Sequence, residues 1–485
     1  MPARTGQDYL TGLRQQPREI FQGGQRIDDV TTFPGLANGA RSIADLYDLQ
    51  CSASLQDEMT YISPTSGERI GLSFLTPRSL EDLRRRRVMM SHWAHTSYGM
   101  MGRTPDFLNV SIMAMASAGD YFAQNRPEFK QNIVNYYEYV REKDLALTHT
   151  LVNLQRNRVP SAASINYSTD VALAVVKETD AGIVVRGPRV LATLGPLSDE
   201  IAVYPTRNST LGIGEDGQRY AFAFAIPCGT PRLRFLCRES FDLNRTHFDH
   251  PLGSRFEEMD AIVFFDDVLV PWERVFLYGD IDLCNNLSSA TNQYTHSGHQ
   301  VVTKNVAKCE FVVGLGSLMV KTLGSGSIPQ VQSLIAETIE NLEIMRSLLQ
   351  TAEANAALDQ WGVMCPAPIP IMIARNLFIR MYPRMAEIVQ LLGSSSLMAL
   401  PSEIDFEGPL GSFLDQYLDT DTTQARDRVR LFHLAWDLAC SSFGGRQVLY
   451  ERYFQGDWMR NASALYNAYG TGPLMQQVQE FLNRP

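Results

Sequence analysis

The spacing of apolar residues changes twice along this chain of 485 residues. In the first part, for example over 127–142, apolar positions recur at helical intervals. Short β-branched and aromatic runs follow, separated by Gly, Pro, Asn and Asp, and long amphipathic segments then return. The pattern predicts a mostly helical N-terminal domain (1–143), a central β-domain (144–277) and a C-terminal antiparallel helical bundle with a tail (278–485).

Local signals sharpen this prediction of an α+β fold. Ser79 is placed to cap a helix over about 79–95, because acidic residues follow in its first turn. Further helices are expected over 110–123 and 127–142. The central runs do not alternate with helical segments, so a doubly wound nucleotide-binding fold is not expected. The sequence also lacks a Gly-x-Gly-x-x-Gly motif.

Composition narrows the class of partner. The net charge of −10 argues against nucleic acid or an anionic membrane as the main partner. The run Arg84–Arg87 is an exception, and it is typical of a solvated helix face. The 7 cysteines are scattered without metal-ligand spacing, so no disulfide framework is expected. With a polar N-terminus and no long apolar run, the sequence predicts a cytoplasmic protein.

One cationic side chain lies on a bend between two apolar segments. Gly102 permits a sharp turn there, and Pro105 pushes the preceding residue out of the helical region. Arg103 therefore projects from a site that is expected to be buried, where an Arg needs an anionic or hydrogen-bonding partner. That partner is either Asp106, which would be structural, or a bound anion, which would be functional.

Two places in the β-domain could hold a ligand. His149 follows an apolar run and is expected to be at least partly buried, with Gln155 and Arg158 adding donors a few residues later. Thr193 ends a predicted strand just before a Gly-Pro break, where the backbone could approach a planar ligand. The simpler alternatives are a satisfied core histidine and an ordinary strand end.

The C-terminal part adds two more candidates. His296 and His299 flank a Ser-Gly pair, but no third ligand lies near them in the sequence, so no metal is expected. Arg446 follows Gly444 and Gly445, and its guanidinium could meet a phosphate or pyrophosphate. A close helix crossing would explain the glycines equally well.

Several separate motifs, in order, make the sequence recognisable. It resembles the oxygenase components of two-component flavin monooxygenases, the 4-hydroxyphenylacetate 3-hydroxylase and chlorophenol monooxygenase family. The motifs are Arg-Thr-Gly-x-x-Tyr-Leu (4–10), Met-Gly-Arg-Thr-Pro-Asp-Phe (101–107), Thr-His-Thr-Leu-Val-Asn (148–153), Ala-Thr-Leu-Gly-Pro (192–196), Phe-Asp-Asp-Val-Leu-Val-Pro-Trp-Glu-Arg-Val-Phe (265–276) and Gly-Gly-Arg-Gln with Leu-Tyr-Glu-Arg and Gly-Asp (444–457).

This resemblance implies an acyl-CoA dehydrogenase-like fold and a defined chemistry. A separate NAD(P)H-flavin reductase would supply reduced FAD, which reacts with molecular oxygen to form a sheltered flavin hydroperoxide. Its distal oxygen would attack a phenol, most often ortho to the hydroxyl. Some members instead release halide or nitro groups. The family pattern also implies a homotetramer, with a dimer as the alternative.

The resemblance also implies roles for individual residues. Arg103 matches the family arginine near flavin and substrate, and His149 matches the histidine that contacts the phenolic oxygen. His296 or His299 lies where chlorophenol members place a catalytic base. The positions that match flavin contacts are Gln155, Arg158, Thr193 and Arg446, the last of which a neighbouring subunit may complete in the family's tetramer.

Phe107 departs from the family pattern, because several hydroxyphenylacetate enzymes have Tyr there. The missing hydroxyl removes one donor from the phenol site, so a larger or differently anchored phenol is expected. Three other classes compete with the monooxygenase reading. An iron–sulfur dehydratase would need converging cysteines, which do not lie near Arg103 or His149 in the sequence. An acyl-CoA dehydrogenase would need a carboxylate base, and a non-enzymatic flavin-binding protein would not need this set of residues.

Overall fold

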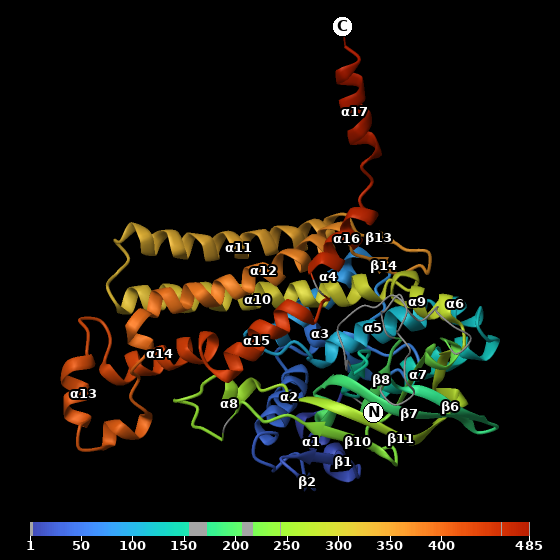
Figure 1. Cartoon of the computed structure of the whole chain (residues 1–485), viewed down its shortest axis with the longest axis horizontal. Coiled ribbons are helices and arrows are strands. Elements are labelled where there is room, and N and C mark those ends of the chain that lie inside the picture. The colour runs from blue at the N-terminus through green and yellow to red at the C-terminus, as the bar shows by residue number, and fades with distance from the viewer. Residues whose placement is uncertain (1–2, 155–171, 206–216, 243, 457, 485) are drawn as a thin grey trace. The chain divides into compact units, whose positions relative to one another are not determined.

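The computed structural model describes residues 3–154, 172–205, 217–242, 244–456 and 458–484 (Figure 1). The chain forms two compact units. The first contains Met1–Lys308, Ala357–Cys365 and Ser402–Ile404, and the second contains Cys309–Ala356, Pro366–Pro401 and Asp405–Pro485. The three-domain division at 143 and 277 stays a prediction.

Capping residues start two helices of the N-terminal part, and one of these starts was predicted. Ser79 caps α4 in a capping box with Asp82. Pro105 occupies the first turn of α5, directly after Thr104. The helix expected over 110–123 instead begins at Pro105 and is interrupted at Ala118, because a proline is accommodated in the first turn of a helix. The helices of this part are α1 (Gly6–Gln15), α2 (Ala37–Gln50), α3 (Gln56–Met59), α4 (Leu80–Thr96), α5 (Pro105–Ser117), α6 (Gly119–Ala123) and α7 (Pro127–Glu142).

The prediction that the whole Arg84–Arg87 run is a solvated face is wrong for Arg86. This side chain lies on α4 with 0% exposure. The run covers a full helical turn, so one of its members must face the interior. Arg86 is therefore a candidate for a buried polar contact.

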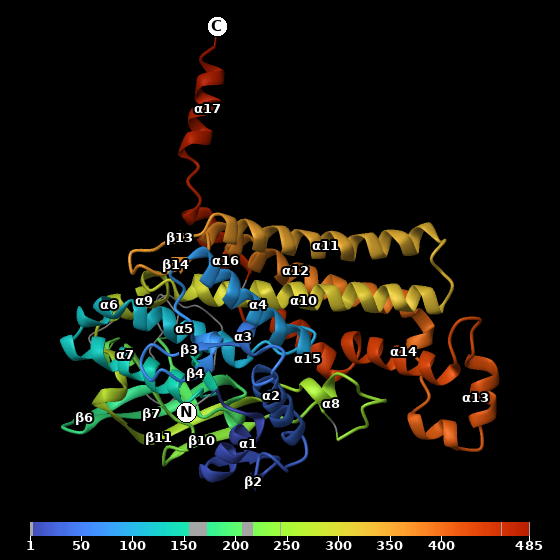
Figure 2. The same cartoon turned by 180° about the vertical axis from the view of Figure 1, so that it is seen from behind.

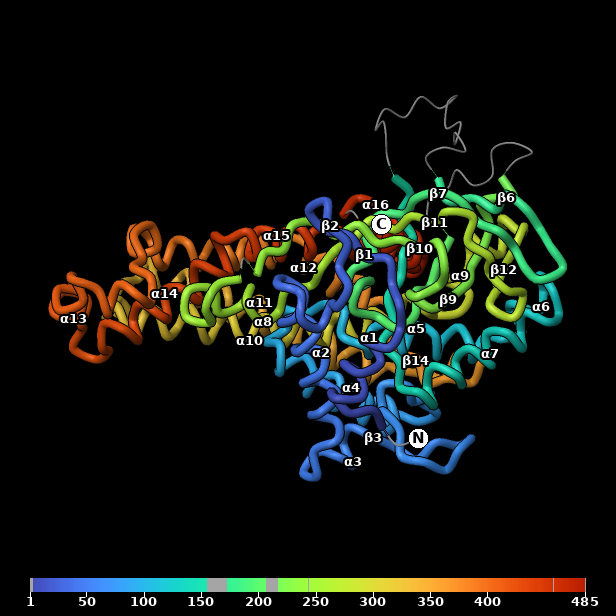
Figure 3. Tube along the Cα trace, turned by 90° about the horizontal axis from the view of Figure 1, so that it is seen from below, coloured from blue at the N-terminus to red at the C-terminus, as the bar shows by residue number. Residues whose placement is uncertain are grey.

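The larger sheet recruits strands from outside the predicted β-domain. Its order is β2-β1-β10-β11-β7-β6, which can be followed across Figure 3. The N-terminal strand β1 pairs in parallel with β10, a contact that local periodicity cannot predict. Its strands are β1 (Glu19–Gln22), β2 (Gln25–Ile27), β6 (Ala174–Thr179), β7 (Gly182–Thr193), β10 (Leu233–Cys237) and β11 (Asp260–Pro271).

A second sheet has the order β12-β9-β8-β5 and carries His149 on β5. Its strands β5 and β8 run parallel, with His149 opposite Ala202. The strands are β5 (Leu147–Thr150), β8 (Glu200–Val203), β9 (Phe222–Pro227) and β12 (Val275–Tyr278). Two hairpins complete the β-structure: β3 (Thr60–Ile62) with β4 (Arg69–Gly71), and β13 (Ala357–Leu358) with β14 (Met364–Cys365).

The second unit is helical, as the returning helical period predicted. Its helices α11 and α12 lie side by side, as both views show (Figures 1 and 2). The helices of the second unit are α11 (Pro329–Ala354), α12 (Pro368–Gly393), α13 (Gly411–Leu418), α14 (Ala425–Ala439), α15 (Ser442–Tyr453), α16 (Trp458–Ala468) and α17 (Gly472–Leu482). The first unit also contains α8 (Gly253–Phe256) and α9 (Ile281–Ala290), and α10 (Gln293–Thr322) begins in the first unit and ends in the second. Among the described residues, none of the helices has the length and apolar character to cross a bilayer.

Candidate functional site

The bend around Arg103 is held by hydrogen bonds to distant parts of the first unit. The Arg103 backbone N–H donates to Glu258 Oε1 at 2.7 Å, and Glu258 has 0% exposure. Asp106, considered above as the partner of Arg103, accepts a hydrogen bond from Thr104 Oγ1 at 2.6 Å. Its Oδ1 also accepts from Gln300 Nε2 at 3.3 Å. These contacts give the bend a fixed shape between two buried segments.

Asp106 is a buried carboxyl beside this bend. Burial raises its pKa to about 6, against the hydrogen bonds from Thr104, Gln300 and the first backbone N–H groups of α5, which lower it. Asp106 lies three residues after the cationic Arg103. A carboxyl group that changes charge near neutral pH is found in functional sites as well as in structural networks.

Arg103, Phe107 and His149 lie together, as the sequence predicted for the phenol site. The guanidinium carbon of Arg103 is 4.1 Å from the centre of the Phe107 ring. The Phe107 and His149 ring centres are 5.7 Å apart. All three side chains are partly exposed, although the residues directly before and after each are buried. The three side chains therefore form one contiguous group, while their roles stay predictions.

Tyr204 is a fourth member of this group that the sequence analysis missed. Its ring centre is 5.8 Å from that of His149. The parallel pairing of β5 with β8 brings it there, because the Tyr204 N–H donates to the Thr150 carbonyl at 3.0 Å. The two strands are about 50 residues apart in the chain, so no local pattern signals the contact.

The Tyr204 hydroxyl is buried in a polar neighbourhood. Burial raises its pKa above the usual range, while Ser111 and Gln293 lie close enough to lower it. Gln293 Nε2 donates to Ser111 Oγ at 2.6 Å. The hydroxyl itself has no hydrogen bond of normal geometry within the described residues. A neutral phenol side chain therefore remains available beside His149.

Thr193, the last residue of β7, lies on the larger sheet and is linked to the strand that carries His149. Its hydroxyl donates to Asp260 Oδ1 at 2.7 Å, and its carbonyl accepts a hydrogen bond from Thr148 Oγ1 at 2.7 Å. The next residue, Leu194, has a φ of 58°, so the chain turns sharply there. Thr193 is thus tied to the strand that carries His149, and Asp260 is a further residue that the sequence did not signal.

His296 is buried on α10 and paired with the buried Arg86. The distance from Arg86 Nη2 to His296 Nδ1 is 3.1 Å. Burial, then Arg86 and His299, lower the pKa of His296 well below its usual range. Because a guanidinium can only donate, Nδ1 accepts and the proton of the neutral ring sits on Nε2. His296 is therefore a poor base.

A possible metal-ligand group includes the same histidine. Ligand atoms of His296, Asp359 and Cys365 lie within 4.8 Å of one another. Arg86 already occupies Nδ1 of the histidine, and Asp359 accepts hydrogen bonds from Asn292 and from the backbone N–H of Trp361. A cation would have to displace a guanidinium from the same spot, so we assign no metal to this cluster.

Arg446 belongs to the second unit, where its guanidinium carbon lies 4.9 Å from the centre of the Tyr450 ring. A Cβ on Gly444 would lie 2.5 Å from the Leu438 carbonyl, so this glycine allows α15 to follow α14 closely. A Cβ on Gly445 would meet no atom of another described segment within 4 Å, so close packing does not require this glycine. A flavin contact for Arg446 stays a prediction. Gln155 and Arg158 lie outside the described residues.

The residues around His149 combine aromatic faces, one cation and hydrogen-bonding groups, which are the interactions that a flavin and a phenol can make. Phe107 and Tyr204 present aromatic faces, and Arg103 supplies a cation. The Thr193 hydroxyl, which donates to Asp260, keeps a lone pair for a donor on the ligand. Asn153 Oδ1 is buried without a hydrogen-bond partner among the described residues. Planar ligands with polar edges fit this set of residues.

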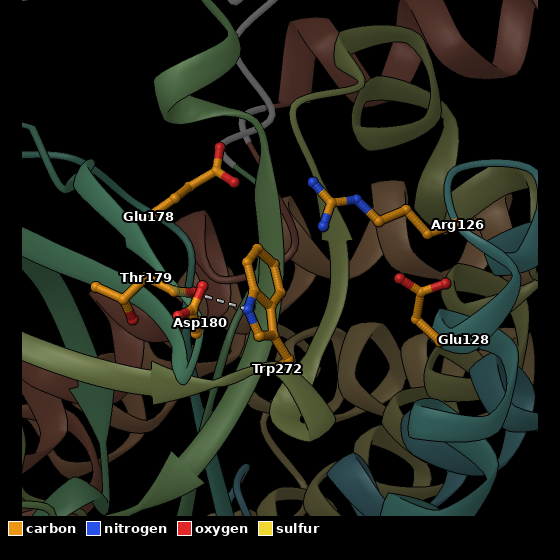
Figure 4. A pocket seen from close by; sticks show the side chains of 6 residues that line it. All are labelled: Arg126, Glu128, Glu178, Thr179, Asp180 and Trp272. Atoms are coloured by element: carbon orange, nitrogen blue, oxygen red, sulfur yellow. Dashed lines mark hydrogen bonds between the residues drawn. The ribbon is translucent and has the colours of Figure 1, made fainter.

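A separate open cavity of about 520 Å³ contains none of the predicted site residues (Figure 4). The Trp272 Nε1–H donates to the Thr179 carbonyl at 3.0 Å, and the Arg126 guanidinium lies 4.8 Å from the Trp272 ring centre. The lining residues are Arg126, Glu128, Glu178, Thr179, Asp180 and Trp272. Arg126 itself covers the aromatic wall, and we assign no ligand to this cavity.

Comparison with known proteins covers almost the whole chain. The family model described as "4-hydroxyphenylacetate 3-hydroxylase N terminal" matches residues 5–277, and its "C terminal" counterpart matches 284–483. The oxygenase component of 4-hydroxyphenylacetate 3-monooxygenase from Geobacillus sp. (strain PA-9) is 45% identical, covering 99% of this chain and 97% of that protein. The oxygenase component of a Rhodococcus 4-nitrophenol 2-monooxygenase is 34% identical, covering 93% and 86%.

Solved structures agree with this result. The oxygenase component of 4-hydroxyphenylacetate 3-monooxygenase, complexed with FAD and 4-hydroxyphenylacetate, matches with a TM-score of 0.94 and 44% identity. The match covers 99% of this chain and 98% of that chain. An archaeal 4-hydroxybutyryl-CoA dehydratase matches with a TM-score of 0.87 at 16% identity, over 99% of this chain and 95% of that chain, which shows a shared fold alone.

Proposed function

Because the chain belongs to the 4-hydroxyphenylacetate 3-hydroxylase family, we propose that Arg103 and His149 hold the phenolic oxygen of its substrate. The family, the acyl-CoA dehydrogenase-like α+β fold and the FAD cofactor that the sequence predicted are confirmed. The protein is a flavin-dependent monooxygenase, the oxygenase component of a two-component system that hydroxylates a phenol with molecular oxygen. A separate reductase is its partner.

The observation that carries the proposal is the convergence of Arg103, Phe107 and His149. A phenol is most reactive toward an electrophilic oxygen when its own oxygen carries negative charge. Arg103 supplies a permanent positive charge for that oxygen, and His149 supplies a hydrogen bond. Phe107 orients the guanidinium through its ring face, an interaction of about 0.5–2 kcal/mol.

Bound FAD supplies the activation of oxygen. The chain's own residues bind and orient the two ring systems and exclude water from them. We propose that the Thr193 hydroxyl meets a polar edge of the flavin. Thr193 is the last residue of β7, and its carbonyl is hydrogen-bonded to Thr148, the neighbour of His149 on β5. His299 is the proposed base for the phenolic proton, because burial and the Arg86 charge keep His296 neutral and Arg86 donates to the Nδ1 lone pair of His296.

The substrate we propose is a phenol that Arg103 and His149 bind at its oxygen, hydroxylated ortho to that oxygen. The Rhodococcus relative, a 4-nitrophenol 2-monooxygenase, supports a second candidate class, nitrophenols. Phe107 cannot donate a hydrogen bond, which favours a substrate anchored elsewhere along its length over 4-hydroxyphenylacetate itself.

Arg103→Ala tests the assignment. Loss of one charge-stabilising group usually lowers the rate by at least ~10²-fold, and the variant should fold normally. Arg26→Ala, at an exposed position of β2 in the first unit, is the matched control and should behave as wild type. Hydroxylation is measured with reduced FAD generated enzymatically. Near-normal turnover of Arg103→Ala would show that the phenol is held by other residues.

We also propose that the protein is a homotetramer, with a dimer as the alternative. The described side chains of α16 and α17 include no buried residue. They nevertheless include large apolar ones that are at least 48% exposed, a surface typical of an interface. These residues are Trp458, Met459 and Tyr466 of α16 and Leu474, Met475, Val478, Phe481 and Leu482 of α17, with Tyr469 exposed between the two helices.

Sedimentation velocity tests this assembly. The double variant Val478→Glu/Phe481→Glu should lower the sedimenting mass, because it places charges on the apolar face of α17. Gln476→Glu adds charge to the same helix outside the apolar set and should not. An active wild-type monomer would rule the oligomer out.

We propose the cytoplasm as the location, since the NAD(P)H used by the reductase is available there.

A further inference from the structure

A glutamine on α10 reaches across the fold to the bend that carries Arg103. Gln300 Nε2 lies 3.3 Å from Thr104 Oγ1 and 3.3 Å from Asp106 Oδ1. Its two N–H groups can serve both acceptors, and the Thr104 hydroxyl donates onward to Asp106 at 2.6 Å. The three side chains form a closed triangle that is at most 3% exposed.

The triangle joins two elements that carry proposed site residues. Thr104 follows Arg103 directly, and Asp106 precedes Phe107. On α10, Gln300 follows His299, the proposed base. The contact spans 194 residues between Gln300 and Asp106, so it is a tertiary link and not part of a local turn. It fixes the Arg103 bend to the first turns of α10.

The other end of the Gln300 amide carries a cost to stability. Gln300 Oε1 is buried and has no hydrogen-bond partner among the described residues. Leaving a buried carbonyl unsatisfied destabilises a fold, and an apolar side chain of the same size would avoid that penalty. The glutamine is therefore better explained by the position that its N–H groups impose on the bend.

We propose that Gln300 is a positioning residue for Arg103. It ties Thr104 and Asp106 to α10, so that the guanidinium meets the phenolic oxygen at a fixed place relative to His299. Glu258 accepts a hydrogen bond from the Arg103 backbone N–H, and this contact ties the same bend to a second distant segment of the chain. A small displacement of a charge-stabilising group lowers rate steeply, because catalysis depends on its aim at the reacting atoms. This inference rests on the proposed role of Arg103.

The test is a pair of near-isosteric substitutions, Gln300→Leu and Gln300→Met. Each keeps the volume of the side chain and removes its hydrogen bonds. We expect the hydroxylation rate to fall at least tenfold, and the share of consumed oxygen that appears in product to fall, with the rest released as hydrogen peroxide. We expect the midpoint of thermal unfolding to stay unchanged or to rise.

Thr104 provides the matched controls. Thr104→Val removes the hydroxyl at constant shape and should reproduce the loss of coupling, whereas Thr104→Ser keeps the hydroxyl and should restore it. Wild-type coupling in Gln300→Leu at unchanged stability would overturn the proposal. A drop of several degrees in the unfolding midpoint of both Gln300 variants would also overturn it, since the contact would then serve stability.

Arg103→Ala is measured in the same series. If Arg103→Ala keeps wild-type turnover, the role proposed for Arg103 fails and the inference about Gln300 fails with it. If Arg103→Ala loses turnover while the Gln300 and Thr104→Val variants keep it, only the inference about Gln300 is wrong.

Discussion

The guanidinium carbon of Arg103 lies 4.1 Å from the centre of the Phe107 ring, so the guanidinium packs over the ring. Phe107 is the predicted departure from the family pattern, and Arg103 is a residue that matches it. Phe107 removes a hydrogen-bond donor and supplies a flat apolar face for the cation. In the proposed site, Arg103 therefore supplies the positive charge and His149 a hydrogen bond, and Phe107 adds no hydroxyl of its own. Four predictions follow from the residues around this pair.

Phe107→Tyr should improve the use of 4-hydroxyphenylacetate. The added hydroxyl can share the phenolic oxygen with His149, whose ring centre is 5.7 Å away. One added hydrogen bond stabilises by about 1 kcal/mol, which is roughly fivefold in kcat/KM. Steady-state rates with small and bulky phenols check this. Phe107→Leu is the control, and an equal gain in that variant would point to space instead of hydrogen bonding.

His149→Ala should separate oxygen consumption from hydroxylation. The variant lacks the hydrogen bond that we propose His149 makes to the phenolic oxygen, while Thr193, the proposed flavin contact, is untouched. We expect oxygen uptake to continue and hydrogen peroxide to replace most of the product. Product and peroxide are quantified together in one reaction. Tight coupling in the variant would show that His149 is a structural member of the Phe107–Tyr204 aromatic group.

Asp106→Asn should change how stability depends on pH. Burial raises the pKa of Asp106 from 3.8 in the unfolded chain to about 6 in the fold. The folded protein therefore holds this proton more tightly. The stability that the proton contributes is present in full below pH 3.8 and is lost as pH rises through 6. The shift corresponds to about 3 kcal/mol.

Asparagine does not titrate, so Asp106→Asn should gain stability relative to wild type as pH rises from 4 to 7. Urea unfolding at several pH values measures this difference. The exposed Asp180→Asn is the control for removing one charge. A difference between wild type and Asp106→Asn that stays constant with pH would mean that Asp106 is already ionised at pH 4.

Glu258→Ala should displace Arg103 by removing the acceptor of its backbone N–H, which lies 2.7 Å from Oε1. Leaving a buried N–H unsatisfied costs about 1–3 kcal/mol, so both the free energy of unfolding and the hydroxylation rate should fall. Glu258→Gln keeps an acceptor oxygen and should retain most of both. Equal losses in the two variants would mean that the charge of Glu258, and not its hydrogen bond, matters.

Local signals in the sequence were enough for much of the helical structure. The Ser79 cap depends on neighbouring residues, and the structure has it as predicted, whereas the helix expected from 110 begins at Pro105. The motif order was enough for the family and its cofactor. Arg103, Phe107 and His149 could be chosen because they lie in those motifs.

Tertiary structure alone decided the partners of these residues. Tyr204 reaches His149 only through the parallel register of β5 and β8, and Asp106 bonds to Gln300 across 194 residues. Arg86 looked like a solvated charge until packing placed it against His296, 210 residues away. Caps and bends are encoded by adjacent residues. Such pairings depend on sheet register and helix packing, which are set by burial summed over the whole fold.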